Sequence, residues 1–140
     1  MKITYNADTI KCISLFQSRT QAAVKDCYID DLGGVLTFVV QPGDIGKAIG
    51  KQGSMVRQLE QTMKRKIKIV EFHPACAEFV KNMIMPFQAA SIQDEEGTIT
   101  ITPADLKTRG ILIGRNASTL RNLEKNVKRS FPNIKEIKVV

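Results

Sequence analysis

Two glycines near residue 50 enclose a short basic segment whose residue types suit phosphate binding. Gly50 and Gly53 flank Lys51 and Gln52, and Ser54 opens a stretch with helical apolar spacing. Glycines lack a Cβ atom, so the backbone can adopt unusual φ angles and allow close approach. The first N–H groups of a helix have no intrahelical partner and lie at the positive end of its dipole. We therefore expect an anion such as phosphate to bind at this turn.

Positive charge is concentrated around this turn and in a second block later in the chain. Lys47 and Arg57 lie on either side of the turn, and residues 47–68 carry seven basic side chains against Glu60 alone. Residues 107–138 carry nine basic side chains against two acidic ones. Because the net charge of the whole chain is only +7, the remaining residues are acidic overall. This distribution favours a polyanionic partner.

The turn and the helix after it recur 64 residues later in the chain. The matching pairs are Gly46 and Gly110, Ile49 and Ile113, Gly50 and Gly114, Ser54 and Ser118, Arg57 and Arg121, Leu59 and Leu123, Glu60 and Glu124, and Lys64-Arg65 and Lys128-Arg129. Some matches, such as Glu60 and Glu124, are charged residues for which we expect no packing role. Matches this dense indicate an internal duplication rather than a shared helical pattern.

The second turn departs from the first at one position. Ala117 stands at the position that matches Gly53, while Gly114, Arg115 and Asn116 complete the turn. Alanine tolerates ordinary helical angles, but it adds a Cβ atom at the point of closest approach. Arg115 still supplies a positive charge. The second turn is therefore expected to bind the same ligand less securely, and the alternative is a repeat retained only for packing.

Hydrophobic periodicity and turn residues predict the same order of elements in both halves of the chain. The first half has a helix from about 8 to 25, strands over 27–29 and 35–40, two helices around residues 50–53, and a strand from 66 to 72. The second half has a helix from 74 to 86, strands over 89–93 and 98–102, a helix after 103, a helix from 118, and a strand over 134–139. The predicted N-caps are Asp8, Ser54, Ser118 and a capping box from Thr102 to Asp105.

The motif Ile49-Gly50-Lys51-Gln52-Gly53 between two helices, followed by a strand, resembles the signature of the K-homology (KH) domain. The order αββααβ resembles its type II form. Over nearly the whole chain, and most specifically over residues 45–72 and 110–129, the sequence resembles the tandem KH region of the NusA family of transcription factors. Without a counterpart of the polymerase-binding and S1 domains of bacterial relatives, it is similar to the short archaeal form.

The resemblance implies an α+β fold of two tandem type II KH domains, residues 1–72 and 73–140, each a three-stranded sheet packed by helices. A KH turn holds the backbone of about four single-stranded nucleotides. The implied partner is single-stranded RNA, with RNA polymerase as a second candidate partner, and the implied role is transcription termination or antitermination. We expect a cytoplasmic monomer without a cofactor. Since no flexible linker separates Phe72 from Pro74, we also expect both RNA sites to form one rigid surface.

The resemblance also assigns the residues expected to contact RNA. In the first domain they are Lys47, Gly50, Lys51, Gln52, Gly53 and Arg57, and in the second they are Gly114, Arg115, Asn116, Ala117 and Arg121. Ile45, Ile49 and Val56 are expected to belong either to the groove for the bases or to the core.

Enzymatic readings of the same residues are less consistent with the sequence. Gly46, Gly50 and Lys51 suggest a P-loop, but the spacing is short and Gln52 stands where Ser or Thr would hold magnesium. The acidic clusters at 30–31 and 94–96 lie in predicted hairpin turns, where such residues are common. We expect no enzymatic activity. A KH protein of ribosome biogenesis and a protein adaptor that does not bind RNA remain alternatives.

The cysteines and the single histidine do not indicate metal or disulfide chemistry. Cys12, Cys27 and Cys76 are odd in number and form no C-x-x-C pair, so we expect buried thiols in a reducing compartment. His73, three residues before Cys76, is expected at the start of a helix. No apolar run approaches the roughly 20 residues that span a bilayer, and the N-terminus lacks the apolar core of a signal peptide.

Overall fold

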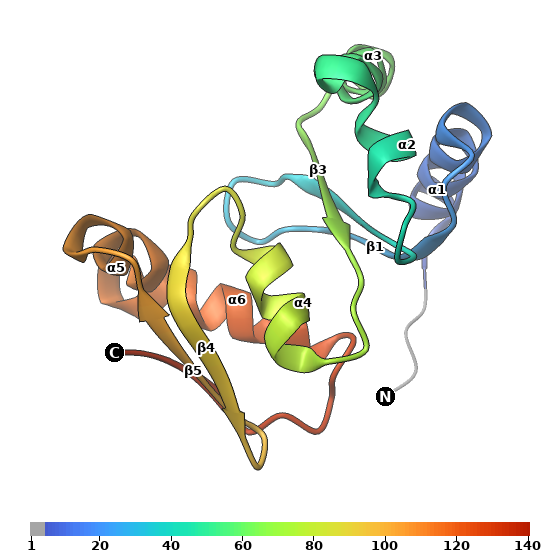
Figure 1. The fold of residues 1–140 in the computed structure, drawn as a ribbon. Coiled ribbons are helices and arrows are strands. Elements are labelled where there is room, and N and C mark those ends of the chain that lie inside the picture. The colour runs from blue at the N-terminus through green and yellow to red at the C-terminus, as the bar shows by residue number, and fades with distance from the viewer. Residues whose placement is uncertain (1–4) are drawn as a thin grey trace. The chain divides into compact units, whose positions relative to one another are not determined.

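The computed structural model of the protein describes residues 5–140, which divide into two compact units. The first unit ends at Phe72 and the second runs from His73 to Val140. Each unit contains a helix, two strands, two helices joined by a short turn, and a final strand (Figure 1). The predicted α+β class, with two KH-like units and a three-stranded sheet in each, is confirmed.

The elements follow the same order in both units. In the first unit they are α1 (Ala7–Thr20), β1 (Val24–Ile29), β2 (Leu36–Val40), α2 (Ile45–Ile49), α3 (Ser54–Met63) and β3 (Ile67–Glu71). In the second unit they are α4 (Cys76–Met83), β4 (Ala89–Glu95), β5 (Thr98–Pro103), α5 (Leu106–Ile113), α6 (Ser118–Lys128) and β6 (Glu136–Val139). Single 3₁₀ turns, Lys51–Gly53 and Arg115–Ala117, join the paired helices.

The second strand of each unit lies in the middle of its sheet. In the first unit β2 is antiparallel to β1 and parallel to β3, so that Phe38 pairs with Cys27 on one side and Ile69 on the other. In the second unit β5 has the same relation to β4 and β6. Parallel neighbours require a long crossover connection. In each unit the crossover consists of two helices and the turn between them. The parallel pairing of the two strands therefore positions the turn.

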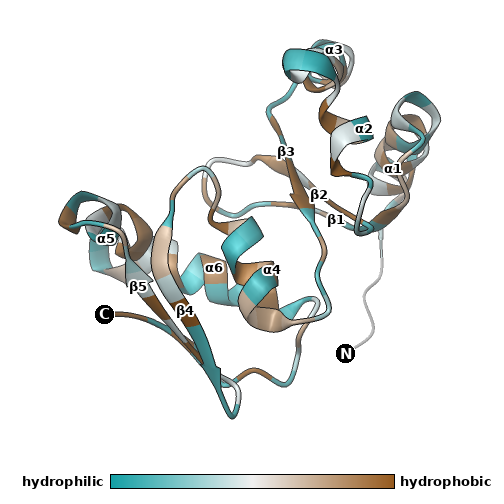
Figure 2. Ribbon diagram, viewed as in Figure 1, coloured by the Kyte–Doolittle hydropathy of each residue, from teal (hydrophilic) through white to brown (hydrophobic). Residues whose placement is uncertain are grey.

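The core of the first unit lies between its three helices and one face of its sheet. Phe16 of α1 stacks on Phe38 of β2, with ring centroids 4.1 Å apart. Ala48 of α2 and Leu59 of α3 are buried in the same cluster. Burial of each large apolar side chain contributes about 1.5–3 kcal/mol. Figure 2 shows hydrophobic residues along β3 and hydrophilic residues over much of α3, which fits a helix with one packed face.

Each unit has an equivalent glutamate whose side chain bonds the last helix of that unit to its last strand. The Oε2 atom of Glu60 accepts a hydrogen bond from the Ile67 N–H at 3.0 Å. In the second unit the Oε2 atom of Glu124 accepts one from the Ile137 N–H at 2.9 Å. The expectation that this pair has no packing role was therefore wrong, because each carboxylate satisfies a strand N–H.

Helix α1 differs from its prediction at both ends. Its N-cap is Asn6 rather than Asp8, and the Asn6 Oδ1 atom accepts a hydrogen bond from the Thr9 N–H at 2.8 Å. The helix ends at Thr20 instead of near residue 25, because Gln21 adopts a left-handed conformation with φ 61°. The chain can then enter β1 at Val24.

The other predicted caps are also shifted. Ser54 and Ser118 are the first helical residues rather than N-caps, and neither N-cap position has a side-chain hydrogen bond. Asp105 is itself the N-cap of α5, whereas Thr102 lies in β5. The Thr108 N–H donates to Asp105 Oδ1 at 2.7 Å, and this bond lowers the pKa of Asp105.

The three cysteines form no disulfide within residues 5–140, and two of them are buried as expected. Cys27 and Cys76 are buried, whereas Cys12 is half-buried. Burial raises the pKa of Cys76 to about 11, with the charge of Asp94 as a smaller cause. His73 lies ahead of α4 instead of at its start, and its Nδ1 atom accepts a hydrogen bond from the Ala75 N–H. Between residues 5 and 140, no helix is long and apolar enough to cross a membrane.

The helix-to-strand bond of Glu60 predicts a loss of stability on truncation. Glu60→Ala leaves the Ile67 N–H without its acceptor, and we expect it to lower the free energy of unfolding by about 1–3 kcal/mol. Glu60→Gln keeps an acceptor oxygen and should cost clearly less. Gln61→Ala, at an exposed neighbour, serves as the control. Urea denaturation of the three variants gives the comparison, and equal effects at both positions would contradict this role.

Candidate nucleic-acid interface

The turn between α2 and α3 contains three residues with positive φ angles, which few side chains tolerate. Gly50 has φ 76° and ψ 175°, Gln52 has φ 54° and ψ 31°, and Gly53 has φ 75° and ψ 13°. Only Gln52 among these three carries a Cβ atom, and Gln52 is exposed. The turn therefore joins the two helices through residues 50–53.

Close packing explains why a glycine is needed at the start of the turn. A Cβ atom added to Gly50 would lie 2.8 Å from Cβ and 2.9 Å from N of Met55. At Gly53 the nearest atom to such a Cβ is Nη1 of Arg57, at 3.3 Å, which is the end of a flexible side chain. A side chain is therefore excluded at residue 50 by the following helix, whereas residue 53 is restricted mainly by its φ angle.

The second turn has the same backbone conformation as the first. Gly114 has φ 73° and ψ 177°, Asn116 has φ 55° and ψ 32°, and Ala117 has φ 59° and ψ 22°. A Cβ atom on Gly114 would lie 2.8 Å from Cβ of Thr119. Ala117 thus takes left-handed angles rather than the ordinary helical angles that alanine tolerates without strain. The packing of the turn outweighs the strain of about 1–2 kcal/mol for an L-residue in this region.

Two adjacent backbone donors are left open by this geometry. Within the described chain, the N–H groups of Lys51 and Gln52 donate to no protein acceptor, because the helical ladder of α2 ends at Gly50. The following N–H of Gly53 is already bonded, to the Gly50 carbonyl at 3.3 Å. Arg115 and Asn116 provide the corresponding open donors in the second turn. Consecutive N–H groups in such a conformation form an anion-binding concavity.

The lysines around the first turn differ in how far their charge is available. Lys51 is exposed and has no carboxylate within ion-pair distance among residues 5–140. Lys47 Nζ lies 3.5 Å from Asp44 Oδ1, so its charge is partly balanced. Asp44 also accepts a hydrogen bond from the Ala23 N–H, and this bond lowers the pKa of Asp44, as does Lys47. Lys51 is thus the more available of the two cations.

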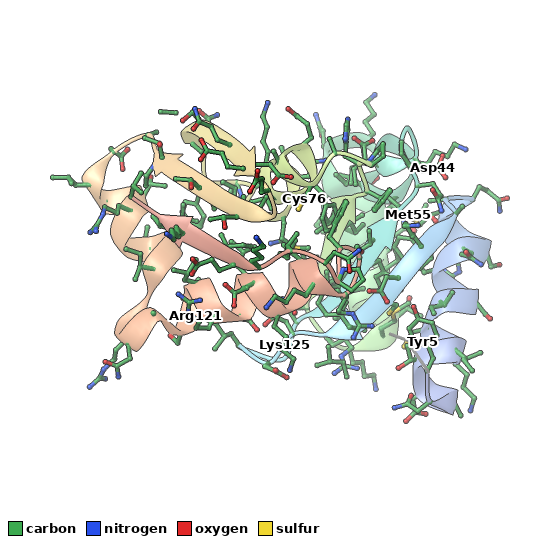
Figure 3. All side chains as sticks on the ribbon, turned by 90° about the horizontal axis from the view of Figure 1, so that it is seen from below. Tyr5, Asp44, Met55, Cys76, Arg121 and Lys125 are labelled. Carbon is green, nitrogen blue, oxygen red and sulfur yellow. The ribbon has the colours of Figure 1, made fainter. Side chains whose placement is uncertain are left out.

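The matched arginines of the two units point to different partners. Arg57 Nη1 donates to the Gln52 carbonyl at 2.6 Å and so folds over the first turn. Arg121, which projects from α6 (Figure 3), instead donates from Nη1 to Glu124 Oε2 at 2.9 Å. A Cβ atom added to Gly53 would lie 3.3 Å from Arg57 Nη1, and Ala117 carries a Cβ atom at the matching position of the second turn. The two turns therefore share a backbone conformation but not a charge distribution.

The three aliphatic residues near the first turn separate into different roles. Ile45 packs against the buried core, and Val56 is half-buried. Ile49 is 38% exposed directly before Gly50. Of the three, Ile49 is therefore the best placed to contact a base whose phosphate lies at the turn.

A basic groove lies further along α3, and of its lining residues only Arg57 was among the predicted site residues. The groove has a volume of about 420 Å³ and is lined by Arg57, Glu60, Gln61, Lys64, Arg65 and Lys66. The only sequence signal for it is the excess of basic residues over positions 47–68. That signal located the charge but not the surface on which the side chains gather.

The model of the KH domain family matches residues 12–81, which include all three strands of the first unit and its glycine turn. The chain therefore belongs to the KH domain family.

Its relatives extend the similarity across both units. The chain is 28% identical to "Probable transcription termination protein NusA" of Halococcus morrhuae over 133 residues, 94% of each chain. It is 28% identical to the protein of the same name from Methanocaldococcus jannaschii over 145 residues, which cover 99% of this chain and 76% of the relative. The crystal structure of APE1850 has the same fold, with a TM-score of 0.74 at 21% identity over 97% of this chain and all of that one. The predicted similarity to archaeal NusA-type proteins is confirmed.

The left-handed Ala117 predicts a stabilising substitution. Ala117→Gly removes the strain of the positive φ angle but gives up some chain stiffness, so we expect the free energy of unfolding to rise by about 0.5–1 kcal/mol. Ser118→Gly is the matched control, because Ser118 has ordinary helical angles with φ −63°. It should lower stability. Thermal or urea unfolding in which Ala117→Gly is the more destabilising change would show that the strain is absent.

Proposed function

We propose that the protein binds single-stranded RNA, with phosphates held at residues 50–53 and, more weakly, at residues 114–117. The observation that supports this most strongly is the pair of open N–H groups of Lys51 and Gln52 on an exposed turn. A phosphate oxygen can accept both bonds, and charge-assisted bonds to an anion are roughly twice as strong as neutral ones. The unpaired charge of Lys51 adds to this attraction.

The bases are proposed to lie on aliphatic rather than aromatic side chains. Ile49 is exposed beside the turn, and only 6% of the residues in the chain are aromatic. In KH domains the glycine turn clamps the backbone of four nucleotides and leaves the bases accessible to the protein. The site therefore suits unpaired nucleotides better than a duplex.

The two turns are proposed to contribute unequally. In the second turn the charge of Arg121 is directed toward Glu124, and the methyl group of Ala117 narrows the approach. Arg115 remains exposed and without an ion pair in the described residues. The second turn is therefore proposed to add affinity to a strand that the first turn already holds. In this arrangement residues 1–72 and 73–140 act as two domains.

The biological role is proposed from the relatives. Proteins that match most of this chain carry the name "Probable transcription termination protein NusA". We infer a role in transcription termination or antitermination, in the cytoplasm and without enzymatic activity, and RNA polymerase is a candidate partner. The runner-up role, in ribosome biogenesis, would use the same RNA site.

A protein-binding role for the second unit is a second candidate, and one observation favours it. Leu106 and Ile111 of α5 are 85% and 37% exposed, respectively. The repeat places Pro42 and Lys47 at the matching positions of the first unit, so α5 exposes more apolar surface at these two positions. Binding that hardly depends on salt would favour this candidate.

Charge reversal at the first turn tests the RNA-binding proposal. The double variant Lys51→Asp/Gln52→Asp places two carboxylates where phosphates are proposed to bind. We expect a loss of RNA affinity of more than about tenfold and a weaker salt dependence. Arg115→Asp should cause a smaller loss. The measurement is fluorescence anisotropy with unstructured RNA oligonucleotides at several salt concentrations.

The matched control is Lys11→Asp/Ser14→Asp, which makes the same charge change on the exposed side of α1. The control should bind RNA nearly as well as the wild type. If the turn variant and the control bind equally well, the turn is not the RNA site.

A further inference from the structure

We propose that the basic groove along α3 is a second phosphate-binding site, which holds the continuation of the RNA strand that the first turn grips. This inference rests on the proposed function. It assigns a role to Lys64, Arg65 and Lys66, none of which belongs to the glycine turn.

The groove is lined mainly by basic side chains whose charges are not neutralised by ion pairs within residues 5–140. Four of its six lining residues are basic, and none of these four has a carboxylate within ion-pair distance among residues 5–140. The only acid in the groove is Glu60, whose Oε2 atom accepts the hydrogen bond from the Ile67 N–H. One carboxylate oxygen is thus already engaged with the fold. Four cations around an open hollow attract a polyanion.

The groove is continuous with the turn through Arg57. Its guanidinium donates to the Gln52 carbonyl within the turn, and the same side chain lines the groove. Helix α3 has ten residues and therefore extends about 15 Å from the turn to its end at Met63. A strand that follows this route must be longer than the four nucleotides that a KH turn clamps.

The backbone at the far end of the groove supports a role beyond helix termination. Lys64 ends α3 in the left-handed conformation, with φ 54°. Glycine or asparagine is the usual residue at such a position, because a side chain with a Cβ atom is strained there. A positive charge near a helix C-terminus interacts favourably with the dipole, which accounts for Lys64 in part. It does not account for Arg65 and Lys66, which lie beyond the helix.

The second unit uses the matching residues differently. Lys128, the counterpart of Lys64, still lies within α6, and its Nζ atom is 3.8 Å from Glu124 Oε1. Glu124 is also paired with Arg121 at 2.9 Å. The counterpart of Lys66 is Ser130. Positive charge that is available in the first unit is therefore partly neutralised or absent in the second, so the proposed extension is specific to the first unit.

The test compares short and long RNA with the groove variant Lys64→Gln/Arg65→Gln/Lys66→Gln of the full chain. Unstructured oligonucleotides of four and twelve nucleotides serve as probes. We expect the affinity for the four-nucleotide probe to change by less than about twofold. The affinity for the longer probe should fall by roughly tenfold or more at low salt, with a salt slope smaller by about 2, because each lost phosphate contact on a single strand removes about 0.7.

Controls separate this proposal from the proposed function. Lys11→Gln/Arg19→Gln/Lys81→Gln removes three exposed cations outside the groove and should bind both probes almost normally. Lys51→Asp/Gln52→Asp should weaken both. If the groove variant binds both probes like the control while the turn variant fails, the groove proposal is overturned and the proposed function stands. If neither variant affects either probe, the proposed function fails.

Lys64→Gly provides a variant that should not unfold. It relieves the positive φ angle, so its thermal stability should equal or exceed that of the wild type, yet we expect weaker binding of the twelve-nucleotide probe. If both this variant and the triple variant bind the twelve-nucleotide probe as the wild type does, the groove proposal is overturned. Lys64, Arg65 and Lys66 would then be only charged residues near the end of α3. An equal loss for the short and the long probe would also overturn the proposal, because the groove would then be part of the turn site.

Discussion

The architecture of the site depends on one steric constraint, the contact between the glycine that opens each turn and the helix that follows. A Cβ atom on Gly50 would clash with Met55, and a Cβ atom on Gly114 would clash with Thr119. This packing favours the positive φ angles of the turn residues. Because the helical ladder stops there, two N–H groups at each turn have no acceptor among residues 5–140. The anion site is therefore a consequence of how two helices are joined.

The duplicated units preserve this constraint and differ in their charges. Both turns keep the opening glycine and the left-handed third residue, even though the fourth residue changes from Gly53 to Ala117. Both glutamates of the repeat bond to a strand N–H. Glu124 additionally pairs with Arg121, whereas Arg57 is left to fold over the first turn. One fold thus presents a strongly basic site and a more neutral one.

The order of elements and the position of the turn could be predicted from the sequence, because periodicity and glycine spacing are local signals. The helix start at Asn6 was missed because Asp8, two residues later, is an equally good capping residue. The left-handed angles of Ala117 could not be predicted, because alanine by itself prefers a helix and tertiary packing overrides that preference. The bond from Glu60 to β3 and the groove beside it depend on residues brought together only by the fold.

The proposed function depends on phosphate binding at the open N–H groups of the first turn. It is tested most directly by following backbone amide resonances of the ¹⁵N-labelled full chain during titration with an unstructured RNA of four nucleotides. We expect the largest shift changes at the amides of Lys51 and Gln52, with smaller changes at Arg115 and Asn116. Saturable binding with no change at Lys51 and Gln52, and with shifts confined to other surfaces, would contradict it.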